Sequence, residues 1–155
     1  MTFDADRKAA RILLVDPDDR LLLFCMHDPD RPARGEWWIT PGGGVEADES
    51  FEDAGRRELF EETGIVADVL GPMIEESMAT WMWGERLVRQ HHRFYVVATS
   101  STAVVSDGWE ESEHLTTRSH RWWTLPEIVT TRERILPENL ATLGAEAVRL
   151  AQALR

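Results

Sequence analysis

The sequence has little of three things: cysteine, basic charge and long apolar runs. Cys25 is the single cysteine, so no disulfide can form within the chain, and a disulfide-stapled secreted fold is excluded. We expect its thiol to be buried and inert rather than reactive, because it lies in the apolar run Leu21–Met26. No run approaches the roughly 18 apolar residues of a membrane span. Met1–Lys8 is polar and has no apolar signal core, so we expect a cytoplasmic protein with no membrane partner.

The shortage of basic charge limits the kinds of ligand. The chain has 17 Lys and Arg residues against 28 Asp and Glu residues, which gives a net charge of −11. A general binder of bulk nucleic acid or of an anionic membrane needs a basic face, so the sequence argues against both. If the ligand is a phosphate, something other than the net charge must neutralise it, and a bound metal is the obvious candidate.

Length and composition indicate a single domain over residues 1–155. A domain has about 150 residues, and a chain with 43% hydrophobic and 29% charged residues is ordinary for a globular protein and not for a disordered one. No internal repeat or Pro/Ser-rich linker interrupts the sequence.

Apolar runs and turn residues predict an α/β fold with a mixed sheet and helices on both faces. The first two strands are expected to form an antiparallel pair, and Ser106–Ser119, which is polar and acidic, is expected to be a loop. The expected strands are Ala9–Val15, Leu21–Met26, Trp37–Thr40, Val66–Leu70, Ser77–Trp83, Phe94–Ala98 and His120–Thr124, and the expected helices are Ser50–Thr63, Leu125–Val129 and Pro137–Leu154.

The helix Ser50–Thr63 has the clearest boundaries. Ser50 with Asp53 three positions later resembles a capping box at its start. Gly64 can adopt the left-handed conformation of the residue that follows a helix, so the helix should end at Thr63.

Three acids in the last turn of this helix have no ordinary explanation. Glu58, Glu61 and Glu62 lie at the negative end of the helix dipole, where anions are disfavoured, and Glu58 and Glu62 form a like-charge pair at i,i+4. They continue the inward-facing side on which Phe51 and Ala54 lie. Divalent cations bound through oxygen would remove the conflict. The alternative is a solvated acidic face, stabilised by an ion pair between Arg57 and Glu61.

The spacing of these residues carries a resemblance. Gly43 is followed after five residues by Glu49, and after seven more by the run Arg57 to Ile65, which reads RELFEETGI. This pattern resembles the Nudix hydrolase signature at every one of its fixed positions. The preceding PGGG at 41–44 and the segment RWWTLPEI at 121–128 also resemble the family. The resemblance implies a Nudix-type α/β/α sandwich with a mixed β-sheet.

The resemblance also implies a reaction. The family hydrolyses a nucleoside diphosphate linked to a further group, by attack of water at phosphorus with Mg²⁺ or Mn²⁺. Homodimers are frequent in the family, and the sequence leaves the oligomeric state open. A binding protein that has lost turnover, a Nudix-like nucleotide sensor, is the alternative, although such proteins usually lose glutamates that are all present here. An isomerase of the same fold would want a catalytic cysteine, and Cys25 lies in a predicted buried strand.

Individual roles follow from the match to the motif. Glu61 and Glu62 match metal ligands, and Glu58 matches a position that serves as ligand, general base or both. Arg57 matches the arginine that orients the glutamates, and Glu49 matches a glutamate that supports the loop or binds a further metal. The carbonyl of Gly42 or Gly43 is a further expected ligand.

Further candidates lie outside the motif. Several family members use an acid from a distant loop, for which Glu113 is the first choice and Glu111 the second; the alternative is that both are solvated loop charges. Aromatic faces stack on nucleobases, so Trp81 and Trp83, which share one side of a predicted strand, are the main base-stacking candidates. Trp38 and Arg34 are additional substrate-binding candidates, with core packing or an ordinary surface position as the alternative.

Overall fold

The computed structural model describes residues 2–106 and 108–155. Its helices are α1 (Phe51–Thr63), α2 (Glu111–Thr116), α3 (Leu125–Thr130) and α4 (Leu140–Leu154), with a short 3₁₀ turn at Pro32–Arg34. Its strands are β1 (Ala5–Val15), β2 (Leu21–His27), β3 (Glu36–Ile39), β4 (Gly42–Gly44), β5 (Met73–Trp83), β6 (Arg86–Ala98), β7 (Thr117–Trp123) and β8 (Ile135–Leu136).

In the described residues these strands form one mixed sheet in the order β5-β6-β1-β2-β3-β8. β1 runs parallel to β6 along its whole length, from Ala5 opposite Val88 to Val15 opposite Ala98. On its other edge, β1 pairs first with β4, through Ala9–Arg11, and then with β2, where Val15 lies opposite Leu21. β2 in turn pairs with β3 and β7. The sheet therefore branches between β4 and β2, and the branch leaves an opening on that edge of β1.

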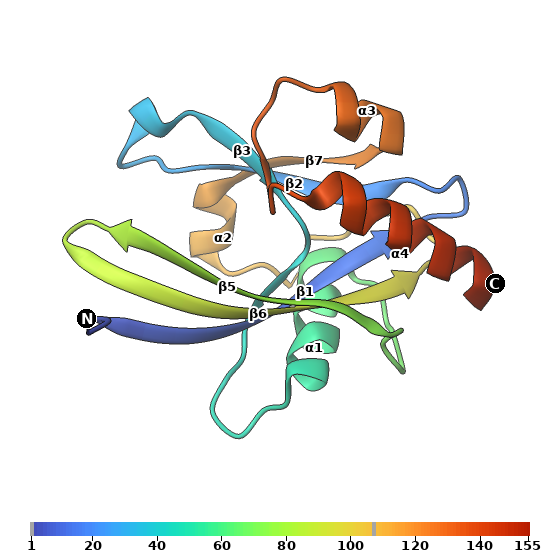
Figure 1. Cartoon of the computed structure of the whole chain (residues 1–155), viewed down its shortest axis with the longest axis horizontal. Coiled ribbons are helices and arrows are strands. Elements are labelled where there is room, and N and C mark those ends of the chain that lie inside the picture. The colour runs from blue at the N-terminus through green and yellow to red at the C-terminus, as the bar shows by residue number, and fades with distance from the viewer. Residues whose placement is uncertain (1, 107) are drawn as a thin grey trace.

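Alternating side chains of β1 enter two separate cores, one on each face of the sheet. Leu13 and Val15 pack in one cluster with α4, which contributes Leu143 and Ala147. Ile12 and Leu14 lie in the other cluster, to which α1 contributes Phe51, Ala54 and Leu59. This period of two is the expected pattern for a sheet that is covered on both faces. Figure 1 shows the hairpin of β5 and β6 extending well beyond the two covering helices. The predicted α/β fold is confirmed.

Helix α1 begins and ends as its sequence predicts. The Oγ of Ser50 accepts a hydrogen bond from the backbone N–H of Asp53 at 3.0 Å. Gly64 adopts a left-handed conformation with a φ of 77°, and its N–H donates to the carbonyl of Phe60 at 2.8 Å. These caps fix the register of the helix, and therefore the direction in which its glutamates point.

Two expectations about the chain after α1 are wrong. Val66–Leu70, which the structure describes in full, is not a strand, because Arg56 donates to the carbonyl of Asp68 and the segment leaves Val66 and Val69 in solvent. The expected loop Ser106–Ser119 contains α2 and the start of β7. Glu110 and Glu113 form a capping box that starts α2, which a scan for apolar periodicity does not detect.

Cys25 lies on β2 and is buried, as expected. Its thiol lies 2.9 Å from Oε2 of Glu36, and burial together with this carboxylate raises its pKa to about 12. The thiol is therefore protonated at neutral pH and a poor nucleophile. In the described part of the chain, no helix is long and apolar enough to cross a membrane.

Candidate active site

A cavity of about 340 Å³ lies at the branch of the sheet. It is open to solvent and is bounded by α1, β2, β3, the segment around α2 and the glycine turn. This name refers here to Pro41 and the short strand β4 (Gly42–Gly44) that follows it. Its lining is formed by Arg11, Phe24, Met26, Ile39, Thr40, Gly42, Gly43, Glu46, Arg57, Glu58, Glu61, Glu62, Trp109, Glu110, Glu113, Thr116 and Thr117. Glu58, Glu61 and Glu62, which the sequence singles out, all reach this cavity.

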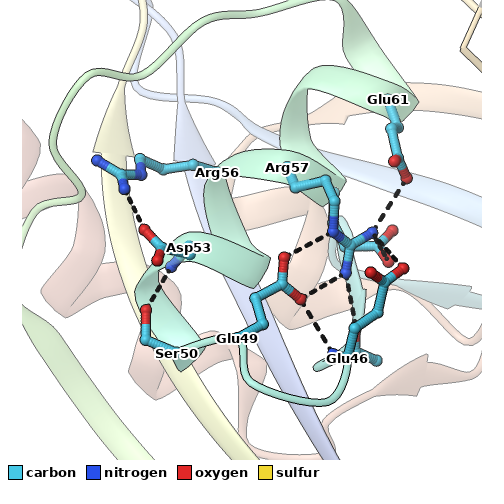
Figure 2. A network of polar contacts seen from close by, with 9 residues as sticks. Glu46, Glu49, Ser50, Asp53, Arg56, Arg57 and Glu61 are labelled. Atoms are coloured by element: carbon cyan, nitrogen blue, oxygen red, sulfur yellow. Dashed lines mark hydrogen bonds and ion pairs between the residues drawn. The ribbon is translucent and has the colours of Figure 1, made fainter.

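Arg57 is the centre of the polar network at the cavity rim (Figure 2). Its Nε and Nη2 hold the two carboxylate oxygens of Glu49 at 2.8 and 2.9 Å. Its Nη1 donates to Glu58 at 3.0 Å and to Glu61 at 3.3 Å, and Nη2 also donates to the carbonyl of Gly44 at 2.9 Å. Hydrogen bonding to Arg57 lowers the pKa of Glu49. Arg57 thus holds two cavity carboxylates and the glycine turn in one arrangement, and it uses Glu49 as its own anchor.

Glu58 lies directly against the glycine turn. A Cβ atom built on Gly43 would come within 2.6 Å of its Oε1, so a side chain at position 43 would displace the carboxylate. Burial raises the pKa of Glu58, and the hydrogen bond from Arg57 opposes this shift only in part. The carboxylate therefore lies where a nearby positive charge would stabilise it.

Glu62 lies deeper and is held by the opposite side of the turn. Its Oε2 accepts a hydrogen bond from the backbone N–H of Gly42 at 3.0 Å. Burial is the main cause that raises its pKa to about 8, and the charge of Glu58 adds to the shift. Burial of this kind favours the neutral form of the carboxyl group until a positive charge lies beside it.

Arg11 is a site residue that the sequence interpretation missed. Its Nη1 donates to the carbonyls of Thr40 and Gly42, at 3.3 and 3.2 Å, and its charge interacts with Glu62 and Glu58. Burial lowers the pKa of Arg11. The sequence does contain a signal for this role, which is an arginine within the apolar run Ala9–Val15. A charged side chain among buried residues needs a partner.

The donor set of the cavity fits a hard divalent cation. The carboxylates of Glu58, Glu61 and Glu62 and the carbonyl of Gly42 offer oxygen only, which is the chemistry that Mg²⁺ and Mn²⁺ prefer. Across residues 2–106 and 108–155, no three acidic, His or Cys side chains already converge as a metal site. The hydrogen bonds explain this: Arg57 holds Glu58 and Glu61 while the Gly42 N–H holds Glu62. Each of these bonds uses one oxygen of its carboxylate, so a cation could bind through the second oxygen of each group.

The segment before and within α2 supplies the remaining wall. Glu113 lines the cavity together with Glu110, and its Oε1 accepts from the backbone N–H of Glu110 at 3.3 Å. Glu111, the second candidate acid, is not among the lining residues. Trp109 was not singled out from the sequence, although it is the aromatic residue that precedes this acidic cluster. Its indole N–H donates to the backbone carbonyl of Glu62 at 2.8 Å.

The four proposed substrate-contacting residues lie outside the cavity lining. Trp38 is 8% exposed and packs edge-to-face against Trp123 in the core, which corrects the expectation that it faces a substrate. Trp81 and Trp83 lie on β5, and the guanidinium of Arg34 lies 5.5 Å from the ring of Trp83. Arg34 and Trp83 thus contact each other, and neither lines the cavity that the glutamates reach.

Comparison with known proteins agrees with this geometry. The family model for the NUDIX domain matches residues 5–143, which include every strand and helix down to the start of α4. The chain belongs to the Nudix family. Nudix hydrolases generally act on nucleoside diphosphate derivatives and use divalent metal ions.

Individual Nudix proteins resemble the chain over part or nearly all of its length. It is 31% identical over 112 residues to diphosphoinositol polyphosphate phosphohydrolase 3-beta of Bos taurus, covering 72% of this chain and 58% of that protein. It is 35% identical over 91 residues to an uncharacterized Nudix hydrolase, YvcI, of Bacillus subtilis, covering 57% and 52%. The chain thus spans about half the length of these relatives. A MutT protein of Methanosarcina mazei shares the fold, with a TM-score of 0.65 and 18% identity over 97% of this chain and 98% of that one.

Proposed function

We propose that the protein hydrolyses a diphosphate bond in a nucleoside diphosphate linked to another group, with Mg²⁺ or Mn²⁺ as cofactor. The observation that carries this proposal is the enclosure of Glu58 and Glu62 against the glycine turn, inside a complete Nudix motif. Enclosed carboxylates whose pKa values are raised are costly in a resting protein and favourable once cations bind beside them.

Each residue has a proposed part in the reaction. Glu58, Glu61 and Glu62, with the carbonyl of Gly42, would hold the cations. When bound by these residues, the cations would supply positive charge that lowers the pKa of the attacking water and offsets the charge of the leaving phosphate. Arg57 keeps Glu58 and Glu61 in position, through the hydrogen bonds described above. Glu58, whose carboxylate lies against Gly43, would serve as ligand, as general base, or as both in turn.

Glu113 in α2 is the proposed additional acid. It lies in the lining of the cavity, whereas Glu111 does not. Its Oε1 accepts from the backbone N–H of Glu110, so a cation could bind through Oε2.

The net charge of −11 fits this proposal. A cavity rich in glutamate repels a bare polyphosphate, but a polyphosphate that binds together with its cations brings the missing positive charge. The cytoplasmic location stays a prediction from the sequence, and the oligomeric state stays open.

A substrate panel tests the proposal. The purified protein is incubated with Mg²⁺ and, separately, with nucleoside triphosphates, dinucleoside polyphosphates, ADP-ribose, nucleotide sugars and a diphosphoinositol polyphosphate, which the name of the bovine relative suggests. The products, which are nucleotides, sugar phosphates, phosphate or pyrophosphate according to the substrate, are separated by ion-exchange chromatography and measured with and without a chelator. We expect chelator-sensitive release from a nucleotide substrate. Metal binding without release from any compound would instead support a nucleotide sensor that has lost turnover.

A further inference from the structure

The cavity has two walls of different chemistry. Its glutamate wall consists of Gly42, Gly43, Glu58, Glu61 and Glu62. Its aromatic wall, which the proposed reaction does not use, consists of Phe24 from β2, Met26 from β2, Ile39 from β3 and Trp109. An apolar surface beside a diphosphate site needs a ligand group that gains from contact with it.

Trp109 connects the two walls. The hydrogen bond from its indole N–H to the carbonyl of Glu62 fixes the ring to the last turn of α1. The Phe24 ring packs against it edge-to-face, with 5.7 Å between ring centroids, and the His114 ring lies 5.1 Å away from another direction. The indole is thus held at a fixed position next to the residue whose carboxylate would bind a cation. A preorganised aromatic ring of this kind binds a planar group at low entropic cost.

The charges of the cavity favour one class of substrate. Six lining residues are glutamates (Glu46, Glu58, Glu61, Glu62, Glu110 and Glu113) and two are arginines (Arg11 and Arg57). Both arginines already donate to protein oxygens. A densely phosphorylated polyol would need free cationic side chains and would leave the aromatic wall without an apolar partner. A nucleotide needs cations only at its diphosphate, and its base offers an aromatic face.

We propose that the aromatic wall binds the nucleobase of the substrate, and that Trp109 is the residue that determines this specificity. The inference rests on the proposed function, because the diphosphate held at the glutamate wall defines the distance to the base. The proposal assigns base recognition to the segment between β6 and β7. The sequence had favoured Trp81 and Trp83 on β5. The proposal also assigns the protein to nucleotide substrates rather than inositol polyphosphates.

Binding of matched probes tests this proposal without turnover. Adenosine and cytidine 5′-(α,β-methylene)diphosphate carry a base and a bridge that resists hydrolysis, and methylenediphosphonate carries the same bridge alone. Dissociation constants are measured by calorimetry with saturating Mg²⁺ for the parent protein and for Trp109→Ala, Trp109→Phe and Trp83→Ala. Trp83 is half exposed and outside the cavity, so its replacement is the matched control for loss of a tryptophan.

We expect Trp109→Ala to weaken binding of at least one nucleoside probe by about tenfold or more, which is the usual effect of losing a stacked base. Binding of methylenediphosphonate should stay within about twofold, and Trp109→Phe, which keeps a ring but loses the bond to Glu62, should retain most of the nucleoside affinity. Trp83→Ala should leave every constant unchanged.

Three results would overturn the proposal. Equal weakening of all probes by Trp109→Ala would mean that Trp109 only positions Glu62, and no weakening would mean that the base binds elsewhere. A loss in Trp83→Ala confined to the nucleoside probes would return base recognition to β5. The substrate panel is independent of these outcomes: an active enzyme that binds all probes equally contradicts only the inference, and an inactive protein that prefers nucleoside probes contradicts only the proposed hydrolysis.

Discussion

The two walls of the cavity are held in different ways. On the glutamate wall, Glu58, Glu61 and Glu62 each have a specific hydrogen-bond donor, either Arg57 or the Gly42 N–H. On the aromatic wall, one hydrogen bond fixes Trp109 to the carbonyl of Glu62, and the side chains of Phe24 and Ile39 are held by packing. Directional bonds fix individual oxygen atoms, whereas packing fixes a surface whose members can adjust. Small changes should therefore be far more damaging on the glutamate wall.

The largest effect should come from Glu62→Gln. The amide has the same size but cannot carry the negative charge that a cation needs, so we expect kcat/KM to fall by at least about a hundredfold with the fold intact. Asp53→Asn, on the exposed side of the same helix, is the matched control and should stay near the parent rate. Initial rates measure the activity of the two variants, and thermal unfolding measures whether their fold is intact. A rate near that of the parent in Glu62→Gln would refute the metal assignment.

A second test compares neighbouring glycines of the turn. In Gly43→Ala the new methyl group displaces the carboxylate of Glu58, so we expect activity to fall by about ten- to a hundredfold. In Gly44→Ala the nearest atom lies 3.7 Å from the new Cβ, so activity should change little. Both proteins should unfold near the parent temperature, because the displaced group is the end of a flexible side chain. Equal activities in the two variants would contradict the placement of Glu58.

Replacement of acids on the α2 segment should have a smaller effect. We expect Glu113→Gln to lower kcat/KM by severalfold, since Glu113 lines the cavity, and Glu111→Gln to leave it unchanged. Mg²⁺ titrations of the initial rate should show a weaker apparent affinity only in Glu113→Gln. If Glu111→Gln has the larger effect, the assignment of the additional acid is reversed.

The last test concerns the pH dependence of stability without metal, which is measured as a free energy of unfolding rather than as a rate. Because the pKa of Glu62 is about 8 in the folded chain and near 4.5 when unfolded, the folded state retains a proton over this range that the unfolded state loses. The contribution of Glu62 to the free energy of unfolding is therefore complete below pH 4.5. It is lost as the pH rises toward 8, by up to about 1 kcal/mol per pH unit. Urea unfolding in a chelator should show that the stability of the parent relative to Glu62→Gln declines from pH 5 to pH 8. Parallel curves for the two proteins would contradict the burial of this carboxyl group.

The glutamate wall could be predicted from the sequence because its signals are local. Ser50 and Gly64 set the ends of α1, and the spacing of Glu58 and Glu62 within one helix sets their common direction. The aromatic wall could not, because Phe24 and Trp109 meet only through the branch of the sheet and lie 85 positions apart. Arg11 was missed for the same reason, since its partners Thr40 and Gly42 lie 29 and 31 positions later in the chain. The short strands β4 and β8 likewise depend on pairing with distant segments rather than on their own residues.

The parallel pairing of β1 with β6 has a consequence for how the chain is made. β1 supplies apolar side chains to both cores, yet its neighbour along its entire length lies about 80 residues later in the chain. Closing such a large loop is slow compared with forming a local hairpin. Until Ala98 has left the ribosome, β1 lacks the strand that pairs with it along this edge, and its apolar side chains stay exposed. During this interval the nascent chain offers a chaperone a hydrophobic segment to bind.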